Sequence, residues 1–134
     1  MTQEAREHYL RIALVAIGCI FIVGVLPLMM LWPAGWRWEP YQPEYEQMIL
    51  GVYATLGIFL LIASRAPDRH RSLILFAGWS SLVHSGIMAI QALRETTERG
   101  HLLGDVPALA FAGVVLLVLA PADVHAGRDE RVTA

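Results

Sequence analysis

The sequence predicts an all-α protein, an integral membrane four-helix bundle that runs up-down-up-down with both termini cytoplasmic. Three observations predict it. Hydrophobic residues make up 56% of the chain and charged residues 16%, against roughly 25% charged in an ordinary soluble domain. Apolar stretches without a charge recur, and each approaches the ~20 residues that a helix needs to cross about 30 Å of hydrocarbon. The arginines gather in alternate connecting segments.

The four hydrophobic stretches occupy nearly all of the 134 residues, so we expect one transmembrane domain over 1–134 with a short cytoplasmic tail over 122–134. We expect its helices at about 9–32, 46–64, 69–94 and 101–120. The first follows Arg6 and Arg11, as in a signal peptide, but its apolar stretch is longer than the about 7 to 15 residues of a signal h-region. We therefore expect it to be retained as a membrane helix.

Arginine placement predicts the orientation, because cytoplasmic segments of membrane proteins collect positive charge. One set of segments carries most of the arginines: Arg6, Arg11, Arg65, Arg69, Arg71, Arg128 and Arg131. The alternate segments carry Arg37, Arg94 and Arg99. The first set, which includes both ends of the chain, is therefore predicted to lie inside.

The first outer loop, WPAGWRWEPYQPEYEQ, is rich in proline and aromatic residues. Its prolines Pro33, Pro40 and Pro43 are expected to prevent a helix. Its aromatic residues are Trp32, Trp36, Trp38, Tyr41 and Tyr45. Indole and phenol rings settle at the headgroup level, which predicts an aromatic belt on the outer leaflet. The same residues also fit a lid over a cavity in the bundle.

The second helix and the turn after it carry local packing and capping signals. Gly51 and Thr55 lie on one helix face, and small residues let neighbouring backbones approach closely in lipid, so we expect a packing seam there. In the cytoplasmic turn SRAPDRHR, Pro67 is expected to end one helix and Asp68 to cap the next.

The third helix carries a polar stripe along one face. At about 100° per residue, this face collects Ala77, Ser80, Ser81, His84, Met88 and Gln91. The adjacent face, which carries Gly78, Ser85 and Ala89, predicts a close helix contact, whereas Trp79 points away from both. His84 lies near the midplane, and Met88 and Gln91 lead from it towards the outer surface.

The fourth stretch is short unless its helix begins at His101, which would place His101 and Asp105 on one face near the outer boundary. Alternatively, Asp105 caps a shorter helix with Pro107 in its first turn. The polar residues expected to converge under the outer loop are Glu46, Gln91, Arg94, His101 and Asp105. We expect Arg94 to pair with Glu46 or Asp105, since a guanidinium keeps such a carboxylate charged.

His84 has two interpretations. A serine-rich face with one histidine is often interhelical hydrogen-bond glue, worth about 0.6 kcal/mol per bond. Ionisable groups within a membrane also commonly mark a functional site. We predict a neutral His84 that faces the bundle interior and forms the floor of a cavity opening outward past Met88 and Gln91.

Several chemistries can be weighed against the sequence. The lone Cys19 rules out an intrachain disulfide and a CxxC pair, and with them quinone-linked thiol oxidases. His84 has no second histidine at matched depth for haem, because His8, His70 and His125 lie at the cytoplasmic edge and His101 at the outer edge. A zinc site of His101, Asp105 and Glu46 is geometrically possible, but no metal or other cofactor is expected. The acidic residue expected in the first helix of a small multidrug-type transporter is missing.

Segments such as YEQMILG, WSSLVH and ERGHLLGDVPAL carry a resemblance to a family of small, uncharacterised bacterial four-helix membrane proteins. The resemblance covers nearly the whole chain, from Leu10 to Pro121. A much weaker similarity in size and helix count to DoxX-like proteins supports the architecture only. The resemblance implies a multi-pass protein of the bacterial inner membrane and leaves its activity open.

Three functions fit these observations. The first is a binding or accessory protein whose outward-opening, partly polar cavity holds a lipid-like or quinone-like molecule, or which docks on a larger membrane complex. The second is a small intramembrane enzyme that uses His84, or His101 with Asp105, as acid and base. The third is a proton or solute pathway. Membrane lipids and a possible second copy are the expected partners, and the net charge of −2 gives no reason to expect nucleic acid.

Overall fold

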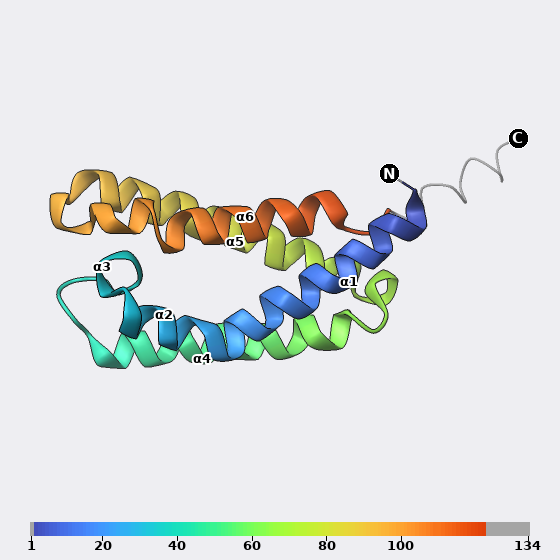
Figure 1. Ribbon diagram of the computed structural model, residues 1–134, viewed down its shortest axis with the longest axis horizontal. Coiled ribbons are helices and arrows are strands. Elements are labelled where there is room, and N and C mark those ends of the chain that lie inside the picture. The colour runs from blue at the N-terminus through green and yellow to red at the C-terminus, as the bar shows by residue number, and fades with distance from the viewer. Residues whose placement is uncertain (1, 123–134) are drawn as a thin grey trace, which may run out of the picture.

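The computed structural model describes residues 2–122, and within them it contains helices and no strand (Figure 1). The elements are α1 (Gln3–Cys19), the π-helix η1 (Ile20–Gly24), α2 (Val25–Leu31), α3 (Pro33–Trp36), α4 (Pro43–Ala63), the 3₁₀-helix η2 (Pro67–His70), α5 (Arg71–Arg94), the 3₁₀-helix η3 (Thr96–Leu102) and α6 (Asp105–Leu119). The predicted all-α class is confirmed. The predicted tail beyond residue 122, with His125, Arg128 and Arg131, lies outside the described residues.

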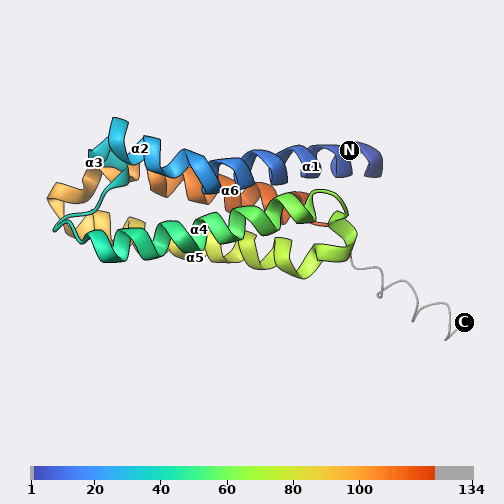
Figure 2. The same ribbon diagram turned by 90° about the horizontal axis from the view of Figure 1, so that it is seen from below.

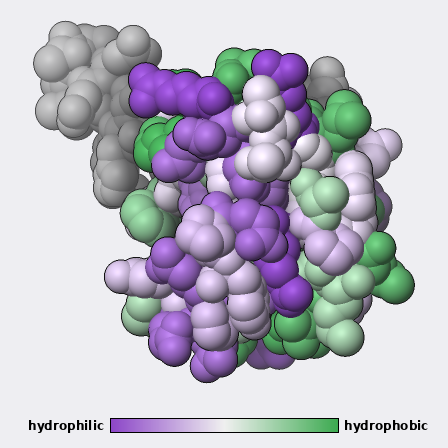
Figure 3. Space-filling view, turned by 90° about the vertical axis from the view of Figure 1, so that its left-hand side faces the viewer, coloured by the Kyte–Doolittle hydropathy of each residue, from purple (hydrophilic) through white to green (hydrophobic). Residues whose placement is uncertain are grey.

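Four helical stretches of residues 2–122 are long and apolar enough to cross a membrane. They are Gln3–Leu31, Pro43–Ala63, Pro67–Arg94 and Thr96–Leu119. The chain's amino end, η2 and the end of α6 lie at one end of the molecule, and α3 and η3 lie at the other (Figures 1 and 2). Hydrophilic side chains gather on the α3–η3 end (Figure 3).

The first span is a composite of α1, η1 and α2. It begins at Gln3 rather than near residue 9, because the Thr2 side chain accepts a hydrogen bond from the Ala5 N–H at 3.3 Å and so caps a polar first turn. The π turn η1 comes shortly before Pro27, which has no N–H to donate and whose ring crowds the preceding turn. Such widened turns occur mostly as single π-bulges within α-helices.

The helices form two close pairs, α1 with α4 and α5 with α6, of which the second is the more extensive (Figure 1). Glycines bring the backbones together in each pair. A Cβ added to Gly57 would lie 2.6 Å from the Gly18 carbonyl oxygen, and one added to Gly113 would lie 2.8 Å from the Gly78 carbonyl oxygen. Both pairs therefore rely on small residues for close approach, as expected in lipid.

The seam predicted at Gly51 and Thr55 is wrong. Both residues are exposed, and a Cβ added to Gly51 would meet nothing within 4 Å. The Thr55 hydroxyl donates instead to the Gly51 carbonyl of its own helix at 2.9 Å. The seam lies on Gly57, because that face of α4 is the one turned towards α1.

The contact predicted around Gly78 and Ser85 is confirmed. Ser85 is buried, and its hydroxyl donates to the Val106 carbonyl of α6 at 2.8 Å. Trp79 is exposed, as predicted. This face of α5 therefore holds α6, which leaves the neighbouring stripe around His84 turned towards the other helix pair.

The turn between α4 and α5 differs from expectation in one respect. Pro67 is buried at the start of η2, after α4 has ended at Ala63. Asp68 does not cap α5, whose N-cap residue is His70 without a side-chain hydrogen bond. The short η2 separates Asp68 from the first free N–H groups of α5, so its carboxylate is displaced from the capping position.

Two guanidinium groups close the carboxyl end of α6. Arg6 donates to the Ala120 carbonyl, and Arg71 donates to the Pro121 carbonyl at 2.9 Å. A helix leaves its last carbonyls without partners, and cations are favourable at that end. These contacts join the starts of α1 and α5 to the end of α6.

The segment 32–47, between the first two spans, is more helical than its prolines predict. Pro33 and Pro43 stand in the first turns of α3 and α4, where a missing N–H costs nothing, so the expectation that they prevent a helix is wrong. The short α3 packs against η3. A Cβ on Gly100 would run into the backbone of Ala34, so this contact requires a glycine.

The predicted helix over 101–120 is interrupted. The segment Thr96–Leu102 is a 3₁₀-helix, the chain turns at Leu103 and Gly104, and α6 begins at Asp105 with Pro107 in its first turn. The alternative of a shorter helix is therefore correct in its length, but Asp105 is the first residue of the helix and not its cap, which is Gly104. The helix begins one residue after Gly104, whose own close approach to the Gly35 backbone requires the absence of a side chain.

Candidate functional site

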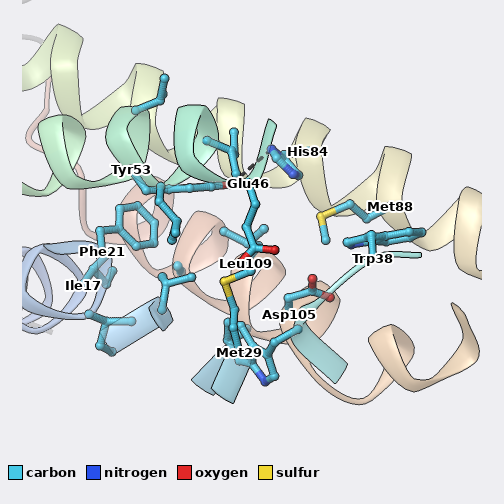
Figure 4. Close-up of a pocket in the computed structure, with 18 of the residues that line it drawn as sticks. Ile17, Phe21, Met29, Trp38, Glu46, Tyr53, His84, Met88, Asp105 and Leu109 are labelled. Atoms are coloured by element: carbon cyan, nitrogen blue, oxygen red, sulfur yellow. Dashed lines mark hydrogen bonds between the residues drawn. The ribbon is translucent and has the colours of Figure 1, made fainter. Parts of the chain in front are cut away.

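A cavity of about 880 Å³ lies between the α1–α4 pair and the α5–α6 pair. Its volume is within the roughly 300–1,000 Å³ range of small-molecule sites. The cavity's two ends differ: Ile17 and Phe21 line one side in Figure 4, and Trp38, Met88 and His84 line the other. Most of the lining is apolar, and the polar groups gather towards α3.

Five of the seven residues predicted to form a site line this cavity: Glu46, His84, Met88, Gln91 and Asp105. They come from α4, α5 and α6, which the helix pairing brings around one space. Arg94 and His101 are not among the lining residues. His101 stands behind the wall, bonded to Asp105, whereas Arg94 is exposed at the end of α5.

His84 reaches the cavity from the middle of α5 and is half-buried. The prediction that it forms the floor is wrong, because the lining continues past it to Ile17 of α1 and Val115 of α6. Its Nδ1 lies 3.1 Å from the Tyr53 hydroxyl of α4, a hydrogen bond that joins the two helix pairs (Figure 4). Its Nε2 has no hydrogen-bond partner within residues 2–122. If Tyr53 donates to Nδ1, the neutral ring carries its proton on Nε2 and can donate it to a ligand. His84 therefore combines a structural bond with a free polar atom.

His101 and Asp105 form a buried pair behind the cavity wall. Asp105 Oδ2 lies 2.9 Å from His101 Nδ1, and Trp38 stacks on the imidazole with ring centroids 4.1 Å apart. His101 Nε2 lies 3.3 Å from the Arg37 carbonyl oxygen and 3.4 Å from a Glu98 carboxylate oxygen. Both ring nitrogens thus face acceptors. A proton on Nδ1 lets the imidazole donate to Asp105, and a proton on Nε2 lets it donate to the Arg37 carbonyl oxygen.

The second oxygen of Asp105 is the unusual atom of the site. Its side chain is 9% exposed, and Oδ1 is buried without a hydrogen-bond partner in the described chain. A buried polar atom without a partner is costly, and native proteins contain few of them. The Trp38 indole and the Val106 backbone N–H also lie near this carboxyl group. Asp105 lines the cavity, as Figure 4 shows, so a molecule held there meets the same carboxyl group.

The expected pairing of Arg94 with Glu46 or Asp105 is wrong. Glu46 Oε1 accepts from Arg37 at 3.2 Å, and Asp105 is bonded to His101. No ion pair of Arg94 occurs within residues 2–122. Glu46 pairs with Arg37 because the loop between α3 and α4 folds back over the cavity, whereas Arg94 is exposed at the end of α5.

The aromatic residues of the outer loop divide between the two interpretations. Trp36, Trp38 and Tyr45 line the cavity, as a lid would. Trp32 and Tyr41 are exposed and do not line it, as expected of an aromatic belt. The lid is held in place by α3 on η3 and by the stacking of Trp38 on His101.

The zinc arrangement considered from the sequence is not assembled. Glu46 is joined to Arg37 rather than to His101 and Asp105. No group of three or more histidine, cysteine, aspartate or glutamate side chains in the described part of the chain could hold a metal ion.

Tyr53 and Trp38 belong to the site but were not predicted to. Tyr53 lies seven residues after Glu46 in α4, a spacing that puts both on one helix face and could have revealed it. Trp38 has no such signal, since its place on His101 depends on the path of the loop. Phe21, which packs edge-on against Tyr53 at 4.8 Å, is likewise positioned by the π turn.

Within residues 2–122, four helical stretches are long and apolar enough to cross a membrane, and a cavity lies between two helix pairs. Residues 5–132 match the model of a family of unknown function, DUF6632, and the chain belongs to that family. The expectation of an uncharacterised family is confirmed. No curated protein and no solved structure matches the chain.

Proposed function

We propose that the protein binds one amphipathic small molecule, lipid-like or quinone-like, in the cavity between its helix pairs. In this proposal the chain is a multi-pass, up-down-up-down bundle of the bacterial inner membrane with both termini cytoplasmic. The cavity then opens towards the outer side, under the loop between α3 and α4, and the arginine-rich η2 end faces the cytoplasm.

The observation that carries the proposal is that one end of the cavity is polar and the other is apolar. Along α6 the lining runs from Asp105 to Val115, which is roughly 15 Å of helix. The polar end holds Glu46, Gln91 and Asp105, and the far end holds only apolar groups such as Ile17. A molecule with a polar head and an apolar tail matches this division.

An acid–base enzyme is the second candidate. The hydrogen bond between His101 and Asp105, beside a cavity that His84 also lines, supports it. Proton transfer to a bound molecule requires a group within hydrogen-bond reach of it, and Asp105 is the member of the pair that lines the cavity. We rank the binding function first because an enzyme that uses this cavity would also have to bind a molecule there.

A proton pathway is less well supported. On the cytoplasmic side of His84, the Ser80 hydroxyl donates to the Ala77 carbonyl of its own helix at 3.2 Å. That bond continues no chain of polar groups towards η2.

The test is to narrow the cavity and to measure the bound molecule. Ala112 is buried in α6 and lines the cavity, so Ala112→Phe places a ring in the tail region. The matched control is Val114→Phe, at a residue of the same helix that is 50% exposed and does not line the cavity. Protein purified in mild detergent is examined by native mass spectrometry and by extraction of small molecules.

We expect the unaltered protein and Val114→Phe to retain a stoichiometric amphiphile and Ala112→Phe to lose it while remaining folded. Equal content in all three proteins, or a lack of any retained molecule in the unaltered protein, would contradict the proposal.

A further inference from the structure

We infer that the molecule held in the cavity carries a hydroxyl head, as in a long-chain alcohol or a phenol, and that the site rejects a carboxylate head of the same chain length. This inference rests on the proposed binding function. It concerns the polar end of the cavity, where Asp105, His84 and Glu46 meet.

Asp105 sets the first requirement, which is a hydrogen-bond donor. One carboxylate oxygen lies 2.9 Å from His101 Nδ1, and Oδ1 is buried with no hydrogen-bond partner within residues 2–122. Wherever the proton between Asp105 and His101 lies, the carboxyl group keeps lone pairs that can accept. A ligand O–H can donate to this carboxyl group, whereas an ester or ketone oxygen cannot.

His84 sets the second requirement, which is a head that can bond to its second ring nitrogen. Nε2 has no hydrogen-bond partner in the described chain. It donates when the Tyr53 hydroxyl donates to Nδ1, and it accepts in the other tautomer. A hydroxyl oxygen both donates and accepts, so one hydroxyl, or the two of a dihydroxy ring, can serve Asp105 and His84.

The charges around the head disfavour an anion. Glu39, Glu46 and Asp105 line the cavity, and no arginine or lysine is among its lining residues. A carboxylate head would therefore meet acceptors and negative charge in a site with low dielectric, where like charges repel strongly.

The experiment compares three probes that share one alkyl chain: dodecanol, methyl dodecanoate and dodecanoate. The unaltered full chain, freed of its copurified molecule by detergent exchange, is equilibrated with an equimolar mixture, and bound probes are counted by native mass spectrometry. Adducts that persist in Ala112→Phe are subtracted as surface binding. The alcohol is expected to exceed each of the other probes by at least about tenfold, the effect of roughly one charge-assisted hydrogen bond.

Asp105→Asn removes the acidic acceptor from the site. Glu44→Gln is its control, since Glu44 is exposed and does not line the cavity. We expect Asp105→Asn to reduce the preference for alcohol over dodecanoate to less than about threefold, and Glu44→Gln to leave it unchanged. If Asp105→Asn does not fold, the ranking of the three probes on the unaltered chain still decides the question.

The outcomes separate this inference from the function on which it rests. Equal or tighter binding of dodecanoate or of the ester overturns the hydroxyl head and leaves a binding protein. If none of the three probes binds, both the head-group inference and the proposed function are overturned. An unchanged preference in folded Asp105→Asn overturns the role given to Asp105.

Discussion

At the scale of single residues, His84 shows how one side chain serves both structure and site. Its bond to Tyr53 is one of the few polar contacts between α4 and α5, and its second nitrogen has no partner in the described chain. A purely structural histidine would have both nitrogens bonded to protein or closed off by packing. His84 instead borders the cavity.

The substitution His84→Phe separates the two contributions. It roughly keeps the volume and removes both polar atoms, so we expect a loss of stability of about 0.6 kcal/mol, one average interhelical hydrogen bond. The content of bound amphiphile should fall several-fold. Detergent-denaturation curves measure the first and native mass spectrometry the second. Trp79→Phe, at an exposed position of the same helix, is the control, and unchanged ligand content in His84→Phe would defeat the functional role.

Sequence periodicity can place residues on a helix face but not choose their partners. The turn of the helix alone predicts that His84, Met88 and Gln91 share a face, and all three line the cavity. Glu46 pairs with Arg37, which a proline-containing loop brings back towards α4. The path of that loop depends on the packing of α3 against η3, which no local sequence pattern encodes.

At the scale of elements, the two helix pairs each depend on a close backbone contact between glycines, Gly18 with Gly57 and Gly78 with Gly113. A spacing of four residues marks a face with small side chains, but a face such as that of Gly51 can equally point into lipid. The π turn η1 was also not predicted, because it arises within continuous apolar sequence. The shorter α6 was one of two alternatives that the sequence left open. Helix existence followed from composition, whereas these interruptions depend on contacts between elements.

The α1–α4 contact predicts opposite effects for two similar substitutions in α4. Gly57→Ala places a Cβ 2.6 Å from the Gly18 carbonyl oxygen, a backbone atom that cannot yield without moving α1, so we expect destabilisation by about 1–3 kcal/mol. Gly51→Ala meets nothing within 4 Å and gains helix propensity, so we expect stabilisation by about 0.5–1 kcal/mol. Both are measured as unfolding in mixed micelles. Equal effects at the two glycines would show that the seam lies elsewhere.

At the scale of the whole molecule, the proposed orientation predicts which turns face the outside. Asp68 in η2 and Thr97 in η3 are both exposed, at opposite ends of the molecule (Figure 1). In a Cys19→Ala background, Thr97→Cys should react with a membrane-impermeant maleimide added to intact spheroplasts, and Asp68→Cys should react only after lysis. The reverse pattern would invert the protein and place the polar end of the cavity on the cytoplasmic side.

The pairing of helices also means that the molecule consists of two helical hairpins, α1 with α4 and α5 with α6, rather than four helices in equal contact. Each hairpin has its own glycine contact, Gly18 with Gly57 and Gly78 with Gly113, whereas α4 and α5 touch sparingly. A chain cut between Ser64 and Pro67 would leave both contacts intact. Co-expressed fragments should therefore reassociate in the bilayer, held by α1 against α6 and by Arg6 on the Ala120 carbonyl. The cavity would then be an interface between two folding units, assembled only when the second unit docks.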